Sequence, residues 1–494
     1  MKTLTTRARE LFPSAFVSLM FLLAYVLFYI KGGPLFSDAD TPWHIAVGNN
    51  ILELGRLPAT DPWSFTAGEH PYYIISWLWD IGIALLQRIG GDQLLFVLLS
   101  LNMALVVGLV CHHISKREGT GTDTIIFTLL MAALSLCIFI SARSQLAGFL
   151  FVAYYHYTLY EHREGRVGRR LFALPLIMII WVNMHGSFMV GFSLLWAYWL
   201  EAWVQGQRAR LRQLVQVTVL CSLALLCNPY GIGLYQAVMG TMGSVMKMQI
   251  SEWQPYNIGI SNASAAWVIM MILSAGFASK RIPLADKLIT GLWLVALLMA
   301  VRNIAIFIVV SAPFMALSLQ ELSNKLESFR LPRPDIRQQL ARPGLHVKLG
   351  MLALLVPIAS FWTLDAIRAD RSYVVGTGQD VTQAVRWFAE HCKGKRFLND
   401  YDYGGRIIYE TGGSCPVFVD GRAGTVYPES LLSDYLDFKE LKPGWFELIE
   451  RYGIDGMFLG NGTVFARAYA DGQYRDKWQE VYRDNVASIY LLKK

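Results

Sequence analysis

The sequence predicts a polytopic α-helical membrane protein that carries a small soluble α/β domain in its C-terminal part. Three observations lead to this prediction. Hydrophobic residues make up 54% of the 494 residues and charged residues only 16%, and the mean hydropathy is +0.37. Apolar windows of about 18 or more residues recur up to residue 364, each long enough to cross a bilayer core of about 30 Å. From about residue 365 the composition becomes that of a soluble domain.

The apolar windows predict about eleven membrane spans within residues 1–364. The first window follows a basic start, is too long for the core of a signal peptide and lacks a small-residue cleavage site, so we expect it to remain as a span. The spans are expected at about 12–30, 93–111, 123–142, 145–160, 171–184, 188–204, 214–226, 265–278, 288–301, 304–319 and 347–364.

The distribution of Lys and Arg predicts the orientation, because cytoplasmic loops carry an excess of both. If residues 72–89 do not cross the membrane, nearly all loop Lys and Arg between residue 89 and residue 365 share the side of the N-terminus. The exceptions are Arg143, Lys247 and Arg302. We therefore expect a cytoplasmic N-terminus and a C-terminal domain on the outer face of the membrane. The net charge of +7 serves this topology and predicts no nucleic-acid partner.

The first periplasmic loop, at about residues 31–91, is rich in acidic residues, Trp, His and Pro. Thr41 is expected to cap a short helix that has Pro42 at its first position. An apolar stripe on that helix consists of Trp43, Val47, Ile51 and Leu54, while Asp40 and His44 share another face. A second amphipathic helix is expected at 72–89, lying in the membrane interface.

Asp38 and Asp40, a D-A-D triplet directly after the first span, are the leading candidates for chemistry. One carboxylate can act as a general base, or the pair can hold a divalent cation, Mg²⁺ or Mn²⁺, against a phosphate. The structural alternative is that both acids complement the dipole of the following helix. His44 is expected to join Asp40 through helical spacing, and a histidine that only binds backbone is the alternative.

Polar residues from distant segments are expected on the same face of the membrane. His185 ends a span in WVNMHGSF, where an ionisable group usually faces a cavity. Arg143 and Arg302 end spans against the charge bias, and we expect them to bind a lipid phosphate, with anchoring in the interface as the alternative. Glu252, beside Trp253, is a candidate to close over a substrate or to stabilise its loop. Further candidates for acceptor contacts or loop structure are Asp61, Glu69, His70 and Asp80.

Residues 365–494 predict a periplasmic α/β domain, with a helix in VTQAVRWFAEH and strands in RFLND, PVFVDGR, GMFLG and SIYLLKK. Asp420 and Arg422 follow one of these runs in a D-G turn, which is more often structural than functional. Cys392 and Cys415 are the two cysteines expected outside the membrane, where an oxidising compartment permits them to pair.

This arrangement resembles the type C (GT-C) glycosyltransferases, which include oligosaccharyltransferases, protein O-mannosyltransferases and the bacterial lipid A aminoarabinose transferase. Shared features are the first span, an outer loop with D-x-D or a single Asp, two interfacial helices, many further spans and an extracytoplasmic C-terminal domain. The resemblance implies transfer of a sugar from a polyprenyl-phosphate or polyprenyl-diphosphate carrier to a cell-envelope glycan, lipid or protein acceptor. It also implies that the chain lies in a bacterial inner membrane, with the first outer loop and the C-terminal domain in the periplasm.

The same resemblance implies that an Asp of the first loop is the catalytic base. That role carries over as Asp38 or Asp40, and the register with His44 favours Asp40. The chain lacks a WWDYG-type tract such as oligosaccharyltransferases carry, which argues against transfer to asparagine. Two alternatives stay open, an O-antigen polymerase or ligase and a polytopic lipid or glycan transporter. The first usually has its decisive loop late in the chain, and the second would show matched, interrupted spans.

Overall fold

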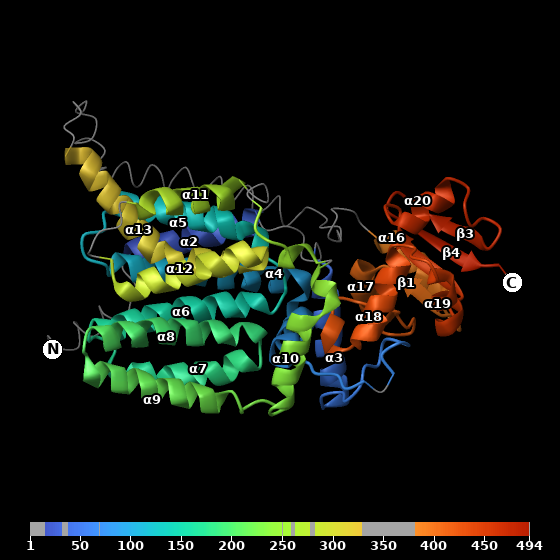
Figure 1. Cartoon of the computed structure of the whole chain (residues 1–494), viewed down its shortest axis with the longest axis horizontal. Helices are drawn as coiled ribbons and strands as arrows, with labels where there is room; N and C mark the ends of the chain where they lie inside the picture. Colours follow the sequence, from blue (N-terminus) through green and yellow to red (C-terminus); the bar gives the residue numbers. More distant parts are fainter. Residues whose placement is uncertain are drawn as a thin grey trace.

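The computed structural model describes residues 15–31, 38–68, 70–248, 250–257, 262–276, 282–328 and 381–493. A bundle of long helices forms one part of the molecule and a C-terminal α/β domain the other (Figure 1). Between them lie α3 (Asp40–Leu54), α10 (Gly233–Gly243) and the first outer loop. The predicted span at 347–364 and the predicted domain boundary at 364/365 lie outside the described residues.

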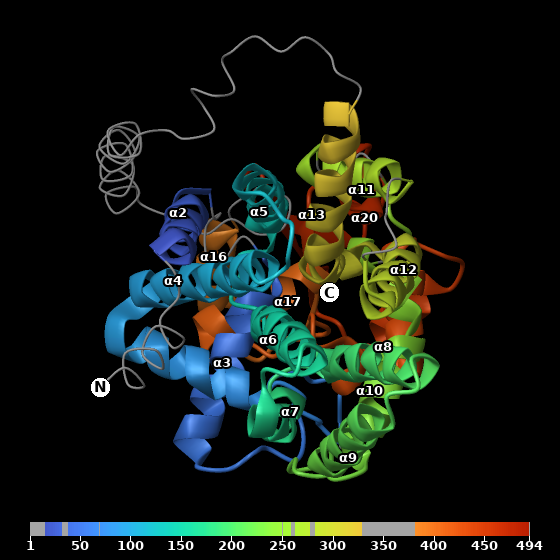
Figure 2. The same cartoon turned by 90° about the vertical axis from the view of Figure 1, so that its left-hand side faces the viewer.

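The helices of the bundle run side by side, as the view along their axes shows (Figure 2). They are α2 (Ala15–Lys31), α4 (Trp77–Ser115), α5 (Thr122–Leu136), α6 (Gln145–Arg163), α7 (Ala173–Val182), α8 (Met189–Val204), α9 (Arg208–Ala224), α11 (Asn262–Ala275), α12 (Leu284–Met299) and α13 (Ile304–Ser328). Every predicted span within the described residues has a helix. Among those residues, three helices are long and apolar enough to cross a membrane by length and composition, Trp77–Ser115, Thr122–Phe139 and Val301–Lys325. The number of about eleven spans stays a prediction.

The first helix of the outer loop, α3 (Asp40–Leu54), starts one residue before the predicted cap. Thr41 is not a cap, because it lies inside the helix with its Oγ1 accepting the N–H of Ala142 at 3.2 Å. Asp38 instead accepts the N–H of Asp40 at 3.1 Å. The first turn thus takes its acceptor from one carboxylate of the D-A-D triplet, and both acids are fixed at the helix start.

The predicted helix at 72–89 is wrong at its start. Tyr72 donates its N–H to the carbonyl of Ala59 at 3.0 Å, and Ile74 donates to the hydroxyl of Tyr230 at 3.0 Å, so this backbone is used outside a helix. The helix begins at Trp77 and continues into the following span as α4, interrupted at Gly90 and Gly91. Gly91 has φ +65°, a conformation that glycine adopts without the penalty a side chain brings. The amphipathic stretch is therefore the first arm of a broken helix.

The C-terminal domain contains a four-stranded sheet with the order β1-β2-β4-β3. Its strands are β1 (Phe397–Asn399), β2 (Gly456–Gly460), β3 (Trp478–Arg483) and β4 (Ala487–Leu492), and β1 pairs parallel to β2 while the other pairs are antiparallel. Its helices are α16 (Thr382–His391), α17 (Tyr401–Thr411), α18 (Glu429–Lys439), α19 (Trp445–Tyr452) and α20 (Val464–Ala470). Cys392 and Cys415 form a disulfide, as the sequence permits.

The predicted strand in PVFVDGR is wrong, because this run does not join the sheet. Val417 forms an isolated bridge with Ser64 of the first outer loop. Its N–H donates to the carbonyl of Trp63 at 2.9 Å, and its carbonyl accepts the N–H of Phe65 at 3.2 Å. One hydrophobic cluster accordingly contains Val47 and Ile51 of α3 together with the core of the C-terminal domain. The outer loop and the domain pack as one body.

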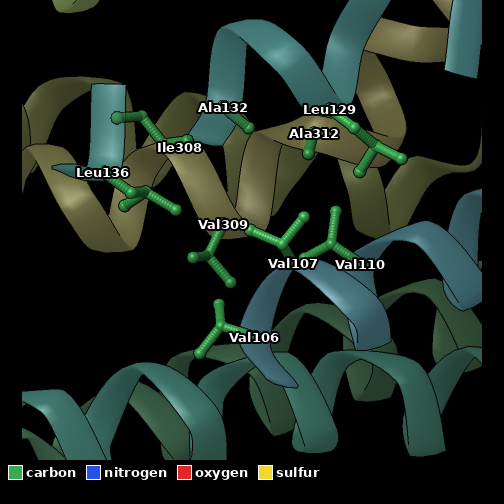
Figure 3. Close-up of a pocket in the computed structure, with 9 residues that line it drawn as sticks. All are labelled: Val106, Val107, Val110, Leu129, Ala132, Leu136, Ile308, Val309 and Ala312. Atoms are coloured by element: carbon green, nitrogen blue, oxygen red, sulfur yellow. The ribbon is translucent and has the colours of Figure 1, made fainter. Parts of the chain in front are cut away.

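A gap between α4, α5 and α13 has a volume of only about 10 Å³ (Figure 3). Apolar side chains line it throughout: Val106, Val107, Val110, Leu129, Ala132, Leu136, Ile308, Val309 and Ala312. It offers no group for chemistry, so the candidate site lies elsewhere.

Candidate active site

Arg143 lies in the short segment between η1 (Cys137–Phe139) and α6, and the neighbouring backbone fixes its place. The N–H of Ala142 donates to Thr41 Oγ1 at 3.2 Å, and the carbonyl of Ala142 accepts from Trp79 Nε1 at 2.8 Å. These two hydrogen bonds tie the segment to both α3 and α4. Arg143 is thereby held at the start of α3.

The guanidinium of Arg143 contacts three carboxylates. Its Nη2 lies 2.8 Å from Asp40 Oδ2 and its Nε lies 3.7 Å from Asp38 Oδ2. Its Nη1 donates to Glu252 of η5 (Ser251–Trp253). The exposed fractions are 18% for Asp38, 19% for Asp40 and 34% for Glu252, so solvent and substrate can reach the cluster. Arg143, Asp38, Asp40 and Glu252 therefore lie together, as expected from the predicted topology. The partners of the Arg143 guanidinium are carboxylates, whereas the sequence predicted a lipid phosphate.

The two aspartates differ in what holds them. Asp40 accepts Arg143 on one oxygen and Trp43 Nε1 at 3.0 Å on the other. A Cβ on Gly421 of the C-terminal domain would lie 2.2 Å from that second oxygen, so only glycine allows this approach. Among the described residues, the contacts of Asp38 Oδ2 are long, 3.5 Å to Thr41 Oγ1 and 3.7 Å to Arg143. Asp38 thus keeps the less engaged oxygen.

The environment of Asp38 also favours its protonated form. Burial raises the pKa of Asp38 to about 6, with Arg143 opposing the rise and Asp40 adding to it. A carboxyl group whose pKa lies close to neutral pH is a better proton acceptor than an ordinary aspartate. Of the pair, Asp38 therefore has the properties of a general base.

His44 faces α4 and not Asp40. Its Nδ1 lies 2.6 Å from Asp80 Oδ1, and Ser76 donates to both oxygens of Asp80 at 3.1 Å. Gly48, one turn on, packs directly on the backbone of Asp80. The register argument that favoured Asp40 over Asp38 is therefore wrong. His44 and Asp80 lock α3 onto α4 beneath the site.

His185 follows α7 and caps η3 (Gly186–Phe188). Its Nδ1 accepts the N–H of Ser187 at 3.1 Å, which leaves the proton on Nε2. Burial lowers the pKa of His185, and together with the neighbouring charges, those of Arg302 and Arg143 first, it brings the value to about 3. Near these residues His185 is a neutral hydrogen-bond donor and not a cation.

Arg302, in η6 (Val301–Asn303), stacks on the indole of Trp253 with its Cζ 4.1 Å from the ring centroid. Lys247 Nζ lies 4.9 Å from the centroid of the same ring. Within the described part of the chain, no residue forms an ion pair or hydrogen bond with Arg302. Sequence reasoning missed Lys247 as a site residue, although its position against the charge bias was the available signal. The two cations thus contact the same indole ring.

The C-terminal domain forms the roof of the site through α17. A Cβ on Gly405 would lie 2.6 Å from the carbonyl of Ala39, so α17 touches the start of α3. Asp402 lies one turn earlier in α17. Its pKa is raised to about 6, first by burial and then by the negative charges of Asp400 and Asp40. Sequence reasoning missed Asp402, which stands in the run DYDYGG.

The D-G-R run joins this roof to the outer loop. Buried Arg422 pairs with Asp420 at 2.6 Å and with Asp61 at 2.5 Å, and Tyr427 donates to Asp420 at 2.6 Å. This is the structural role expected for Asp420 and Arg422. Asp61 is correspondingly a loop anchor, as Asp80 is. Nδ1 of His70 is buried with no partner among the described residues, and Glu69 lies outside them.

No protein-family model and no curated protein sequence matches the chain. It is similar to the structure of the archaeal oligosaccharyltransferase AglB from Archaeoglobus fulgidus in complex with an inhibitory peptide and a dolichol-phosphate. The TM-score is 0.60 at 12% identity, over 90% of this chain and 69% of that one. It is also similar to ArnT from Cupriavidus metallidurans in the apo state, with a TM-score of 0.54 at 11% identity, over 96% and 97% of the two chains. This chain has the GT-C fold.

The apo form of the Archaeoglobus fulgidus oligosaccharyltransferase gives a TM-score of 0.54 at 13% identity, with 90% of this chain and 69% of that chain covered. The resemblance drawn from the first loop is thus confirmed for the fold. At such identities the likeness carries the fold and not the residues, so the chemistry of this chain rests on its own side chains.

The carboxylates around Arg143 do not fit a resident divalent cation as they are arranged. Mg²⁺ and Mn²⁺ prefer several oxygen ligands around one point. In the described ranges no group of three His, Cys, Asp or Glu residues is placed to hold a metal ion. The point where Asp38, Asp40 and Glu252 converge is occupied by the Arg143 guanidinium.

A cleft of about 370 Å³ opens beside α3, a volume in the range of small-molecule sites. It is lined by Ala46, Asn49, Asn50, Glu53, Trp63, Arg88, Ile408, Tyr409 and Gly412. Arg88 binds Asn49 at 2.6 Å and Glu53 at 3.0 Å. The Oδ1 of Asn50 is buried without a partner among the described residues. The cleft therefore combines the partly exposed ring of Tyr409 with the exposed carboxylate of Glu53.

Proposed function

We propose that the protein is a membrane glycosyltransferase. It moves a sugar from a polyprenyl-phosphate or polyprenyl-diphosphate carrier to a hydroxyl of a cell-envelope glycan, lipid or protein on the periplasmic face of a bacterial inner membrane. One observation carries the proposal: Glu252 and Trp253 are adjacent on η5, and they join the carboxylate half of the site to the cationic half. A base and an anion-binding pair within one site are what such a transfer needs.

The donor phosphate binds the cationic half. Arg302 and Lys247 flank Trp253 and offer two positive charges to the phosphate, while neutral His185 adds an Nε2–H donor. Stabilising charge that develops on a leaving group is usually the largest catalytic contribution. The dolichol-phosphate named with the AglB structure supports a polyprenyl phosphate as the carrier class.

The acceptor reacts at the carboxylate half. Asp38 takes the proton of the acceptor hydroxyl, the hydroxyl oxygen bonds to the anomeric carbon, and the bond from that carbon to the phosphate oxygen breaks. The phosphate leaves with the electron pair, opposite Arg302 and Lys247. Asp40, held by Arg143 and Trp43, keeps the start of α3 and its neighbour Asp38 in position.

Carbohydrate is the acceptor class that the cleft favours. A sugar ring presents a flat apolar face and a rim of hydroxyls, which match the partly exposed ring of Tyr409 and the exposed carboxylate of Glu53. The cleft lies along the same helix as Asp40, about 15 Å from it by helix rise. A glycan chain two or three sugars long spans that distance.

The test uses the full chain in nanodiscs with a panel of polyprenyl-phosphate and polyprenyl-diphosphate sugars, and it measures release of the lipid phosphate. We expect release with at least one donor. We expect Asp38→Asn to slow it by about 10²- to 10⁴-fold, the usual contribution of a general base. Asp437→Asn, which removes an exposed carboxylate on α18, is the matched control and should behave as the wild type. Full release by Asp38→Asn would refute the mechanism.

A further inference from the structure

We propose that the Arg143 guanidinium is the resident cation of this site and takes the place of a divalent metal ion, so that sugar transfer needs no metal. The activity part of this inference rests on the proposed function. The part on cation binding does not, because it concerns only which positive charge the three carboxylates hold.

The geometry is that of a cation surrounded by oxygen ligands. Three nitrogens of one guanidinium face three carboxylates, Nη2 facing Asp40, Nε facing Asp38 and Nη1 facing Glu252. The carboxylates come from the first outer loop and from η5, which are more than 200 residues apart in the chain. A hard divalent ion would recruit oxygens from separate segments in the same way.

Arg143 is built into the site and is not a mobile surface residue. The two backbone hydrogen bonds of Ala142, to Thr41 and from Trp79, fix its Cα against α3 and α4. Its side chain is only 21% exposed. A guanidinium keeps its charge at all physiological pH values and has donors on every side. It can therefore hold three carboxylates together permanently.

The choice of cation has a chemical consequence for Asp38. A divalent ion bound directly to its carboxylate would strongly favour the ionised form and remove its basicity. One guanidinium at 3.7 Å opposes three carboxylates only in part. Burial accordingly still raises the pKa of Asp38 to about 6. An arginine in this place gathers the acidic residues while leaving one of them able to accept a proton.

The first experiment measures metal dependence on wild-type protein in nanodiscs. Chelation with EDTA should leave lipid-phosphate release unchanged within about twofold, which is below 0.5 kcal/mol in the barrier. Mn²⁺ followed by electron paramagnetic resonance should stay free in solution. Loss of release on chelation with recovery on Mn²⁺ or Mg²⁺ would overturn the inference. So would Mn²⁺ binding to the wild type that disappears in the variant with both Asp38→Asn and Asp40→Asn.

The second experiment removes the guanidinium. Arg143→Ala leaves three carboxylates around an empty position, and we expect it to bind Mn²⁺ and to gain thermal stability as Mn²⁺ is added. Arg143→Lys restores a positive charge and should bind none. Arg451→Ala, which removes an exposed arginine paired with Asp434, is the matched control. Absence of Mn²⁺ binding by Arg143→Ala, in protein whose elution and unfolding show it to be folded, rejects the inference.

The two proposals fail separately. If no donor yields lipid phosphate but Mn²⁺ binds only after Arg143→Ala, the glycosyltransferase proposal falls and the built-in cation stands. If release occurs and stops on chelation, the transferase stands and the built-in cation falls.

Discussion

Two arginines of this chain hold aspartates in opposite ways. Arg117, at the end of α4, donates to both oxygens of Asp286 on α12. The guanidinium of Arg117 also lies 2.8 Å from His113 Nε2. The side chains of Arg117 and Asp286 are 4% and 1% exposed. Arg143 is 21% exposed and shares its nitrogens among three separate carboxylates. A buried ion pair of one cation and one carboxylate has a structural role. One cation that faces three partly exposed carboxylates leaves negative charge available for chemistry.

Helix α6 connects the two clusters. Arg143 lies just before its first residue, and His156, 3.3 Å from Asp286, lies about 20 Å further along the helix axis. A buried polar network thus lies at one level of the bundle, and a partly exposed cluster of carboxylates around Arg143 lies at another. The difference teaches that the number of carboxylates per guanidinium, together with exposure, separates a structural arginine from a functional one.

The largest effect outside the candidate site is expected from Asp286→Ala. Removing one partner of a buried ion pair leaves the other charged and unpaired, which costs about 3 to 5 kcal/mol. We expect a large fall in the unfolding midpoint in detergent, while release of lipid phosphate per folded molecule stays at the wild-type value. Unchanged stability together with lost activity would break the comparison, because the buried cluster would then be the functional one.

The sequence reveals the parts of this molecule that are decided locally. In a bilayer each helix must form all its backbone hydrogen bonds within itself, so a span can be predicted from its own residues. The bias in Lys and Arg then predicts that Asp38, Arg143, His185 and Arg302 lie on one face of the membrane. Features that depend on docking were not predictable in this way. Asp402 reaches the site only because α17 rests on α3. Edge strand β3, partly exposed along most of its length, carries no apolar alternation to mark it.

Local pattern also misled where tertiary partners intervened. PVFVDGR has the composition of a buried strand, but its backbone hydrogen bonds are formed with the first outer loop and not with the sheet. Asp40 and His44 lie one turn apart on a helix, as expected, but the His44 side chain forms its hydrogen bond with Asp80 on α4. Both errors arise from a contact with a segment distant in sequence, which no periodicity encodes.

The cationic half gives the next largest effect. Arg302→Ala should raise the KM for the lipid-linked donor by about 10- to 100-fold, since a charged hydrogen bond to phosphate contributes about 1.5 to 3 kcal/mol. Lys247→Ala should raise it less, because its distance from the shared indole is greater. Arg208→Ala, on the side expected to be cytoplasmic, is the control. Equal effects of all three variants would mean that the charge acts only through the general field of the protein.

The pH dependence sharpens the contrast within the carboxylate half. Asp38 must be ionised to accept a proton, and its pKa is raised to about 6, so the rate should climb between about pH 5 and pH 7 and level off above. The effect on stability has the opposite sign. A carboxyl whose folded pKa is raised stabilises the fold when protonated, and that contribution is lost as pH rises through about 6. Asp38→Asn should remove both trends.

Asp402 supplies the control for this profile, because burial raises its pKa to about 6 as well. We expect Asp402→Asn to keep the rise in rate near pH 6. If that rise disappears in Asp402→Asn and persists in Asp38→Asn, the proton acceptor belongs to the C-terminal domain, and the first outer loop only positions the substrate.

The smallest effect is expected at the cleft beside α3. Glu53→Ala removes an exposed carboxylate that lines the cleft and pairs at the surface with Arg88, so it should leave the fold intact and cost an acceptor glycan one hydrogen bond, about 0.5 to 1.5 kcal/mol. That corresponds to roughly a two- to tenfold rise in the KM for a glycan acceptor of three sugars, with no change for a single-sugar acceptor too short to reach the cleft. Hydrolysis of the donor by water, which needs no acceptor, should stay at the wild-type rate. An equal rise in KM for the short and the long acceptor would place the loss at Asp38 and Asp40, because only a remote contact distinguishes the two lengths.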